Sequence, residues 1–291
     1  MMSEAGERVW RCCDRRIPLA RTQVMGIVNV TPDSFSDGGL WFDAGRAVAH
    51  GLELAAEGAD LLDVGGESTR PGSAEVDEAE ELRRVLPVIR ALAEKSGVPV
   101  SVDTRRPTVA RAAVDAGACI VNDIMPFAAD AAMAAAVRET GAGVVVMHLR
   151  GTPQTMARCA VYDDVVAEVE DALKEAATYA EAQGIARERV VIDPGIGFAK
   201  TTTHNLALLA ETERLARIAP LLVGASRKRF IGELCGEPVA ADRVGGSVGI
   251  AVWCASHGVS VVRVHDVKAT RQALTTVREL DKAKEGLSRG A

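Results

Sequence analysis

Apolar and polar positions follow one another along this chain in a repeating unit. Each unit starts with a short apolar run, ends that run on a polar residue, and continues through a loop into a helical segment. In the clearest unit, an apolar run from Ala59 ends at Asp63, Gly65 and Gly66 interrupt it, and a polar loop through Arg70 follows. A short apolar run bounded by turn residues predicts a buried strand of a parallel sheet.

The unit occurs eight times. The predicted strands are 23–30, 59–63, 98–103, 119–124, 142–147, 189–193, 220–224 and 260–264, and the predicted helices are 43–57, 76–94, one from residue 107, 128–140, 163–183 and 269–283. Strands that alternate with helices indicate an α/β fold, and eight such units are typical of a (β/α)8 TIM barrel. We predict one barrel domain over 17–284, a mobile N-terminal tail over 1–16 and a C-terminal tail over 285–291.

Length, composition and charge narrow the function classes. The 291 residues suit one barrel of ordinary size, and hydrophobic residues at 48% provide a large core. No apolar run approaches the roughly 20 residues that span a bilayer, and residues 1–16 lack the apolar segment of a signal peptide. The net charge of −6 offers no overall attraction for a phosphate backbone. We therefore expect a protein that binds neither nucleic acid nor membranes.

The cysteine pattern points to reduced thiols. The six cysteines are Cys12, Cys13, Cys119, Cys159, Cys235 and Cys254. They show neither CxxC spacing nor a disulfide framework, so we expect free thiols, no zinc site and a cytoplasmic protein.

The polar residue at or just beyond the end of each predicted strand is the candidate for chemistry. These residues are Asn29, Asp63, Asp103, Asn122, His148, Asp193, Ser226 and Arg263. TIM-barrel sites lie at the carboxyl ends of the strands, so we expect these side chains to converge. A carboxylate there is partly out of water and needs a hydrogen-bond donor. Three acids and an amide predict an acceptor-rich pocket, which suits a flat heterocycle with several N–H donors, although capping of the next helix explains any single acid equally well.

The candidate cations come late in the chain. Lys228, Arg263 and His265 follow the last two predicted strands, where barrel enzymes often bind phosphate. Arg70, after the second strand, is placed to reach the same mouth. Asn29 is a candidate oxygen ligand for a magnesium ion (Mg2+) that is bound to phosphates, because Mg2+ takes few protein ligands and prefers oxygen.

Several short motifs in this order closely resemble the dihydropteroate synthase family, a pterin-binding family of folate synthesis. The motifs are NVTPDSFSDGG at 29–39, DVGGESTRPG at 63–72, SVDT at 101–104, ND at 122–123, DPGIGF at 193–198, SRK at 226–228 and RVHD at 263–266. The resemblance covers about 24–274. It implies a transferase that condenses 4-aminobenzoate with 6-hydroxymethyl-7,8-dihydropterin pyrophosphate and releases pyrophosphate, with Mg2+ as cofactor and a homodimer as the assembly.

The resemblance also implies site residues. The catalytic residues that it implies are Asp37, Asp103, Asp193 and Lys228. The substrate-binding residues that it implies are Asp63, Phe35, Thr69, Arg70, Asn122, Met147, Gly224, Arg263 and His265. It places the pterin on Asp103, Asn122, Asp193 and Lys228, and the pyrophosphate with its Mg2+ on Asn29, Arg263 and His265. Loops carrying Phe35, Asp37, Thr69 and Arg70 would close around aminobenzoate and exclude water.

Family chemistry has pyrophosphate leaving first and a cationic pterin remaining, which buried acids would stabilise. Two segments depart from the family pattern, the bulky residues at 124–127 and the adjacent Arg105 and Arg106. They motivate an alternative, a catalytically inactive or weakly active paralogue that binds pterin-site or sulfonamide and sulfone ligands. A pterin-dependent methyltransferase is a further alternative. For the dimer, the apolar residues Val252, Trp253 and Leu274 on the outer helices of the last third are candidates, and core packing explains them equally well.

Overall fold

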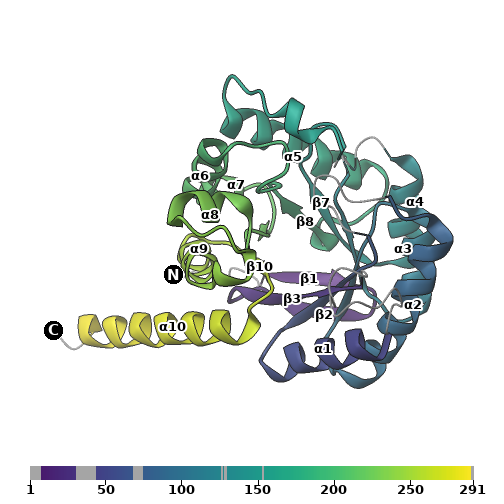
Figure 1. Cartoon of the computed structure of the whole chain (residues 1–291), viewed down its shortest axis with the longest axis horizontal. Coiled ribbons are helices and arrows are strands. Elements are labelled where there is room, and N and C mark those ends of the chain that lie inside the picture. Colours follow the sequence, from purple (N-terminus) through teal and green to yellow (C-terminus); the bar gives the residue numbers. More distant parts are fainter. Residues whose placement is uncertain are drawn as a thin grey trace.

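The computed structural model describes residues 8–30, 44–67, 75–125, 127, 130–152 and 154–289. In that part of the chain, parallel strands form a barrel that helices surround (Figure 1). The barrel strands are β3 (Gln23–Asn29), β4 (Leu61–Gly65), β5 (Val100–Asp103), β6 (Ile120–Asp123), β7 (Gly143–Met147), β8 (Val190–Asp193), β9 (Leu222–Val223) and β10 (Val261–Val264). The α-helices are α1 (Ala44–Ala56), α2 (Glu78–Lys95), α3 (Pro107–Asp115), α4 (Ala131–Thr140), α5 (Val165–Ala182), α6 (Thr202–Ala210), α7 (Thr212–Leu215), α8 (Arg229–Cys235), α9 (Val244–Ser256) and α10 (Val267–Arg289).

Strand pairing confirms the predicted TIM barrel. The eight strands pair in the order β8-β7-β6-β5-β4-β3-β10-β9, and every pair is parallel. A bridge between Ile192 and Leu221 joins the two ends of this order, and the Ile192 amide donates to the Pro220 carbonyl at 3.0 Å. The sheet therefore closes on itself, and the carboxyl ends of all its strands surround one mouth.

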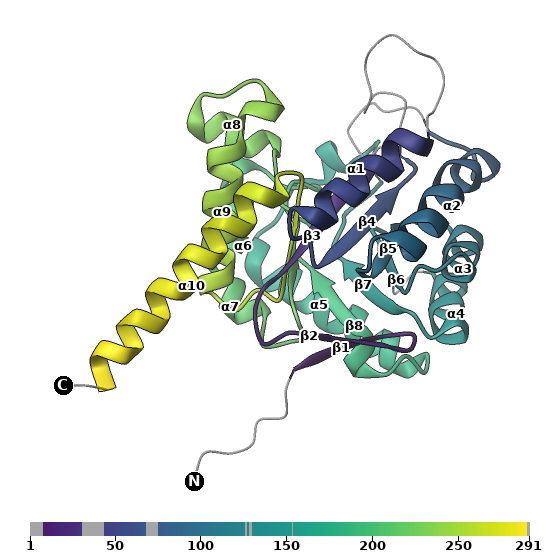
Figure 2. The same ribbon diagram turned by 90° about the horizontal axis from the view of Figure 1, so that it is seen from below.

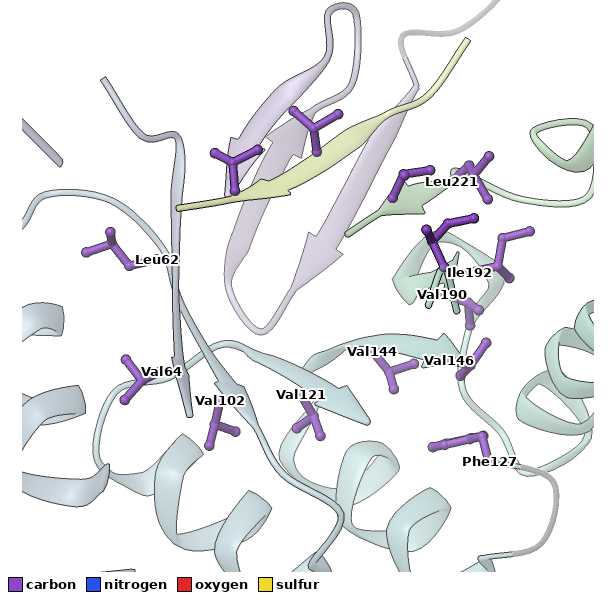
Figure 3. Close-up of a cluster of buried hydrophobic side chains, with 14 of the residues drawn as sticks. Leu62, Val64, Val102, Val121, Phe127, Val144, Val146, Val190, Ile192 and Leu221 are labelled. Carbon is purple, nitrogen blue, oxygen red and sulfur yellow. The ribbon is translucent and has the colours of Figure 1, made fainter. Parts of the chain in front are cut away.

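Alternate side chains of each strand pack on opposite sides of the barrel wall. Leu61 points into the barrel and Leu62 toward the helices, as the two-residue period of a strand requires. Figure 3 shows the outer layer. Its labelled strand residues are Leu62, Val64, Val102, Val121, Val144, Val146, Val190 and Ile192. Burying each such side chain stabilises the fold by roughly 1.5–3 kcal/mol.

An antiparallel hairpin closes the amino-terminal end of the barrel, and Figure 2 shows it lying across that end. It consists of β1 (Val9–Cys12) and β2 (Arg15–Pro18). Trp10 is fully buried and its indole N–H donates to the Arg189 carbonyl at 2.9 Å. Gly143 makes room, because a Cβ there would lie 2.5 Å from Cys12 Sγ. The predicted mobile tail over 1–16 is therefore wrong for residues 8–16. The sequences VWRC and RRIP of these two strands contain arginines and no continuous apolar run, so they lack the pattern that marked the barrel strands.

The last helix, α10, extends away from the barrel (yellow in Figures 1 and 2) and continues to Arg289. The predicted C-terminal tail at 285–291 is therefore wrong for 285–289, which are helical. Among the described residues, the helices are all too short or too polar to span a membrane.

Candidate active site

Four side chains from four strands form one hydrogen-bonded cluster in the mouth of the barrel. Arg263, on β10, donates from Nε to Asp63 Oδ2 at 2.6 Å and from Nη2 to Asp103 Oδ2 at 2.8 Å. Asn122 Nδ2 donates to the same Asp63 oxygen at 2.9 Å. The structure thus brings together Asp63 of β4, Asp103 of β5, Asn122 of β6 and Arg263, all predicted from sequence.

None of the strand-end acids caps the helix that follows it. The N-cap residues of α2, α3 and α6 are Asp77, Arg106 and Thr201. Asp63, Asp103 and Asp193 therefore belong to the mouth, and the capping alternative is wrong for them.

Burial makes this cluster electrostatically unusual. Burial raises the pKa of Asp103 to about 7, with Arg263 opposing that rise and Asp63 adding to it. The pKa of Arg263 is raised, because attraction to Asp63 and Asp103 outweighs the opposing effect of burial. Asp63 Oδ1 and Ser101 Oγ are buried with no hydrogen-bond partner within the described residues, although the two residues are neighbours across β4 and β5. These two buried oxygens at the mouth are therefore able to accept hydrogen bonds from a ligand.

Asp193 and Lys228 occupy the other part of the mouth. Asp193 Oδ1 accepts from the Gly195 amide at 2.7 Å, and Lys228 Nζ donates to the Ile196 carbonyl while lying 4.0 Å from the Phe198 ring centroid. Gly197 has φ 81°, and a Cβ there would lie 2.6 Å from Lys228 Cδ, so glycine is required. Gly195 has φ 67°, and a Cβ there would lie 2.1 Å from the His148 carbonyl oxygen, so both glycines of the DPGIGF motif are explained.

Burial and mutual attraction shift the pKa values of Asp193 and Lys228 in opposite directions. Burial lowers the pKa of Lys228 to about 8, and Asp193 opposes this. Burial raises the pKa of Asp193, which the Gly195 amide and then Lys228 oppose. Arg263 also lowers the pKa of Asp193, so the two parts of the mouth lie in one electrostatic environment.

The remaining predicted residues line the same end of the barrel. Asn29 ends β3, is half-buried, and pairs in register with Gly65. Met147 ends β7 in a buried apolar cluster against which Phe198 packs. A Cβ at Gly224 would lie 3.7 Å from Arg263 Cβ, so this glycine leaves space beside the arginine. The His265 amide donates to Ser226 Oγ at 3.1 Å.

Phe35, Asp37, Thr69 and Arg70 lie outside the described residues.

Sequence reasoning missed Lys200. Its Nζ lies 3.0 Å from His148 Nδ1 and donates to the Phe198 carbonyl at 2.9 Å, so it holds the loop that carries Phe198. Burial lowers the pKa of Lys200 to about 7, and burial followed by Lys200 lowers that of His148 to about 3. The available signal was a lysine two residues after the DPGIGF motif, in a loop at the mouth.

The two departures from the family pattern are the bulky segment 124–127 and the adjacent arginines. Ile124 is buried in the same apolar cluster as Met147, and Met125 packs against that cluster, as Phe198 does. Phe127 is fully buried in the layer between strands and helices and packs edge-on against Tyr179 at 6.3 Å between centroids (Figure 3 labels Phe127). Arg106 pairs with Glu67 at 3.1 Å and also with the buried Glu81. Arg105 pairs with Glu67 at 3.3 Å. The bulky segment therefore does not place Phe127 in the pocket, and both arginine charges are paired.

Within the described residues, no three His, Cys, Asp or Glu side chains gather in a way that would hold a metal ion.

Comparison with known proteins identifies the family. Residues 25–265 match the sequence model of the family described as pterin binding enzyme. The chain is 46% identical over 270 residues to a dihydropteroate synthase of Escherichia coli K12, covering 92% of this chain and 95% of that one.

Solved structures give the same result. The chain resembles a Xanthomonas albilineans dihydropteroate synthase with 4-aminobenzoic acid, with a TM-score of 0.89 and 49% identity over 95% of this chain and 99% of that one. A complex of the enzyme from the same organism with 7,8-dihydropteroate gives a TM-score of 0.86 and 47% identity over 94% and 98%. The chain therefore belongs to the family of pterin-binding enzymes that includes these dihydropteroate synthases.

Proposed function

We propose that this protein is a dihydropteroate synthase, which joins 4-aminobenzoate to 6-hydroxymethyl-7,8-dihydropterin pyrophosphate and releases pyrophosphate. The observation that carries the proposal is the cluster of Asp63, Asp103, Asn122 and Arg263 in one mouth with Asp193 and Lys228. The relatives that share this fold at high identity are named for the reaction, and two of the solved structures hold its substrate or its product.

The mouth supplies the groups that a pterin ring needs. A pterin presents N–H donors along one edge and ring acceptors beside them, so carboxylate and amide oxygens of Asp103, Asn122 and Asp193 match the donors. Lys228 matches an acceptor. Because these groups are largely out of water, each hydrogen bond to the ring is stronger than it would be on the surface.

The same acids suit bond cleavage. The bond between the pterin methylene carbon and the diphosphate oxygen breaks, and positive charge develops on the pterin. Asp103 and Asp193 lie where a negative charge would stabilise it. The aminobenzoate nitrogen then forms the new bond to carbon and gives up one proton.

We assign the diphosphate to the late cations and the metal to Asn29. Arg263 and His265 would bind diphosphate oxygens. Magnesium would be held largely by the diphosphate and water, with the Asn29 amide oxygen as a protein ligand, because Mg2+ takes few protein ligands when phosphates supply oxygens. When bound, Mg2+ neutralises part of the charge of the leaving diphosphate.

Aminobenzoate recognition is assigned from the family resemblance. We propose that Phe35, Asp37, Thr69 and Arg70 build that pocket. The apolar wall that Met147 and Phe198 share lies at the same end of the barrel and suits the flat benzene ring.

We further propose a cytoplasmic homodimer. The six cysteines are free thiols, which supports a reducing compartment. Trp253 on α9 is 46% exposed and is the strongest candidate for the dimer interface. Leu274 of α10 packs partly buried against the core, so it is a weaker candidate.

The test is direct. Purified protein with both substrates and Mg2+ should form dihydropteroate, and Asp193→Asn should lower kcat/KM at least a hundredfold. Binding of the pterin substrate without product formation would reject the synthase and favour the inactive paralogue. The methyltransferase alternative has no support from the site, since the SRK segment that places Lys228 would have no role in it.

A further inference from the structure

Arg227, in the loop between β9 and α8, has a backbone conformation that few residues adopt. Its φ is 59°, in the left-handed region that favours glycine. A non-glycine residue in that region is strained, and such strain persists only where the surroundings hold it. The residue stands between Ser226 and Lys228, so its conformation decides where these two side chains point.

Three neighbours hold this conformation. The Arg227 amide donates to Ser247 Oγ at 2.9 Å, and Arg243 Nη1 donates to the Arg227 carbonyl at 3.0 Å. The Arg227 guanidinium donates from Nε to Asp266 Oδ2 at 2.9 Å and from Nη2 to Asp266 Oδ1 at 2.5 Å. Paired bonds of this kind fix orientation as well as distance. The loop is therefore tied to α9 on one side and to the end of β10 on the other.

The Arg227–Asp266 pair is the second of two adjacent links between the same two loops. In the first, the His265 amide donates to Ser226 Oγ at 3.1 Å, and His265 Nδ1 lies 3.1 Å from that oxygen. The segment 226–228 is thus joined to 263–266 at two consecutive positions. Those segments carry Lys228, Arg263 and His265.

We propose that Arg227 is a positioning residue that, through Asp266, locks segment 226–228 to segment 263–266 and so sets the geometry of diphosphate binding. This inference rests on the proposed function. The competing account is that Arg227 binds the diphosphate directly through its charge. Its two bonds to Asp266 favour the positioning role, because the Nε and Nη2 donors that would bind a phosphate already donate to the Asp266 carboxylate.

The substitution Asp266→Asn separates the two accounts by sign. It removes a negative charge and loosens Arg227. If Arg227 bound the anion directly, the variant would bind inorganic pyrophosphate more tightly, because one repulsive charge is gone and a cation is released. If Arg227 acts by positioning, the variant should bind pyrophosphate at least fivefold more weakly. The measurement is calorimetric titration of the full chain with inorganic pyrophosphate and Mg2+.

The substitution Arg227→Lys gives a second contrast. Lysine keeps the positive charge but loses the planar fork. The positioning role predicts that R227K binds pyrophosphate at least fivefold more weakly than wild type. The double variant R227K/D266N should bind it no more weakly than whichever single variant has the lower affinity, because both substitutions break the same link between residues 227 and 266. Unchanged affinity in R227K, tighter binding in D266N, or losses that add in the double variant would each overturn the proposal.

Two further variants keep the test interpretable. Arg214→Gln breaks another arginine–carboxylate ion pair, with Glu170 at 2.5 Å, beside the start of β8, and should leave pyrophosphate affinity unchanged. If R227K does not fold, Arg227→Gly relieves the backbone strain and still removes the link, so it should also weaken pyrophosphate binding. Dihydropteroate formation by the wild type is measured separately. Its absence would reject the proposed function, whereas wild-type affinity in the variants would reject only the positioning role.

Discussion

At the residue scale, the site depends on how Arg263 is shared. One guanidinium serves two carboxylates, Asp63 and Asp103, so this cluster keeps a surplus of negative charge when both are ionised. Burial of Asp103 offsets part of that surplus, because it raises the pKa of this carboxyl to about 7 and leaves it only partly ionised near neutral pH. A ligand with N–H donors would relieve the same repulsion. Repulsion between the acids and their burial therefore lower the stability of the folded protein, and substrate binding would offset that loss. A loss of stability at a functional site is common in enzymes.

The Asp103 carboxyl should make the stability of the protein depend on pH. Its folded pKa of about 7 lies above its ordinary value of 3.8, so the stability it contributes is complete below about pH 4 and is lost as pH rises through 7. Asp103→Asn removes that dependence. We expect D103N to gain stability relative to wild type between pH 5 and pH 8, on the order of 2 kcal/mol. Urea unfolding at both pH values measures this.

The control for that experiment is Asp171→Asn, whose side chain is 79% exposed and should show no such trend. A difference between D103N and wild type that stays constant from pH 5 to pH 8 would contradict the raised pKa of Asp103.

Lys228 should contribute directly to pterin binding. Lys228→Ala removes a partly buried ammonium, and a hydrogen bond to a charged group contributes about 1.5–3 kcal/mol, so affinity for the pterin pyrophosphate should fall roughly ten- to hundredfold. Calorimetric titration without aminobenzoate gives the number. Lys174→Ala, on the exposed face of α5, is the matched control. If K228A binds the pterin pyrophosphate as tightly as wild type does, the lysine only holds the loop through its bond to the Ile196 carbonyl and does not contact the pterin.

The sequence allowed most of these residues to be predicted, because strand-end polar residues follow a visible apolar run. Lys200 escaped, since it follows a loop and nothing local shows that it turns back to His148. Arg263 was expected among the cations that bind diphosphate. Its bonds to Asp63 and Asp103 follow from the curvature of the barrel, which brings β10 within reach of β4 and β5 and which no local pattern reports.

At the element scale, segments with a continuous apolar run or a periodic apolar face were predictable, and segments without either were not. Helices such as α2 and α5 have clear apolar faces and acidic N-caps, so their predicted bounds lie within a few residues of those observed. The helices α6 to α9 were missed. The helix α9 is almost uniformly apolar and small, and α7 is a single turn, so neither shows a periodic face. The strand β9 has only two residues paired with β10, and a single bridge from Leu221 to Ile192 joins it to β8.

The N-terminal hairpin should stabilise the whole barrel. Trp10 is fully buried among side chains at the amino ends of the strands, so Trp10→Ala leaves a cavity there and should cost about 3–5 kcal/mol. Thermal and urea unfolding measure the loss. Val161→Ala, at a side chain that is 74% exposed, should change stability by less than about 0.5 kcal/mol. A W10A variant as stable as V161A would mean that the hairpin only covers the barrel.

At the scale of the whole molecule, the barrel is not equally strong around its circumference. Strands β3 and β4 pair at five positions, from Met25 with Leu61 to Asn29 with Gly65. Strands β10 and β9 pair at two, and β9 meets β8 through the single bridge of Ile192 and Leu221. Fewer ladder bonds give a lower free energy of local opening. We call this weakest junction, between β8 and β9, the seam.

The seam should open first and should be the part that substrate closes. Asp193 ends β8 and Lys228 follows β9, so a pterin held by both bridges the seam from above. In native-state hydrogen exchange, the Ile192 amide should exchange faster than the β3 amides from Met25 to Val28, and saturating pterin pyrophosphate should slow it. The slowing follows from linkage, since a ligand that needs the closed seam stabilises it by its binding free energy. Faster exchange of the β3 amides than of the Ile192 amide would show that the barrel opens elsewhere. An Ile192 exchange rate that the ligand leaves unchanged would show that the ligand does not bridge the two sides of the mouth.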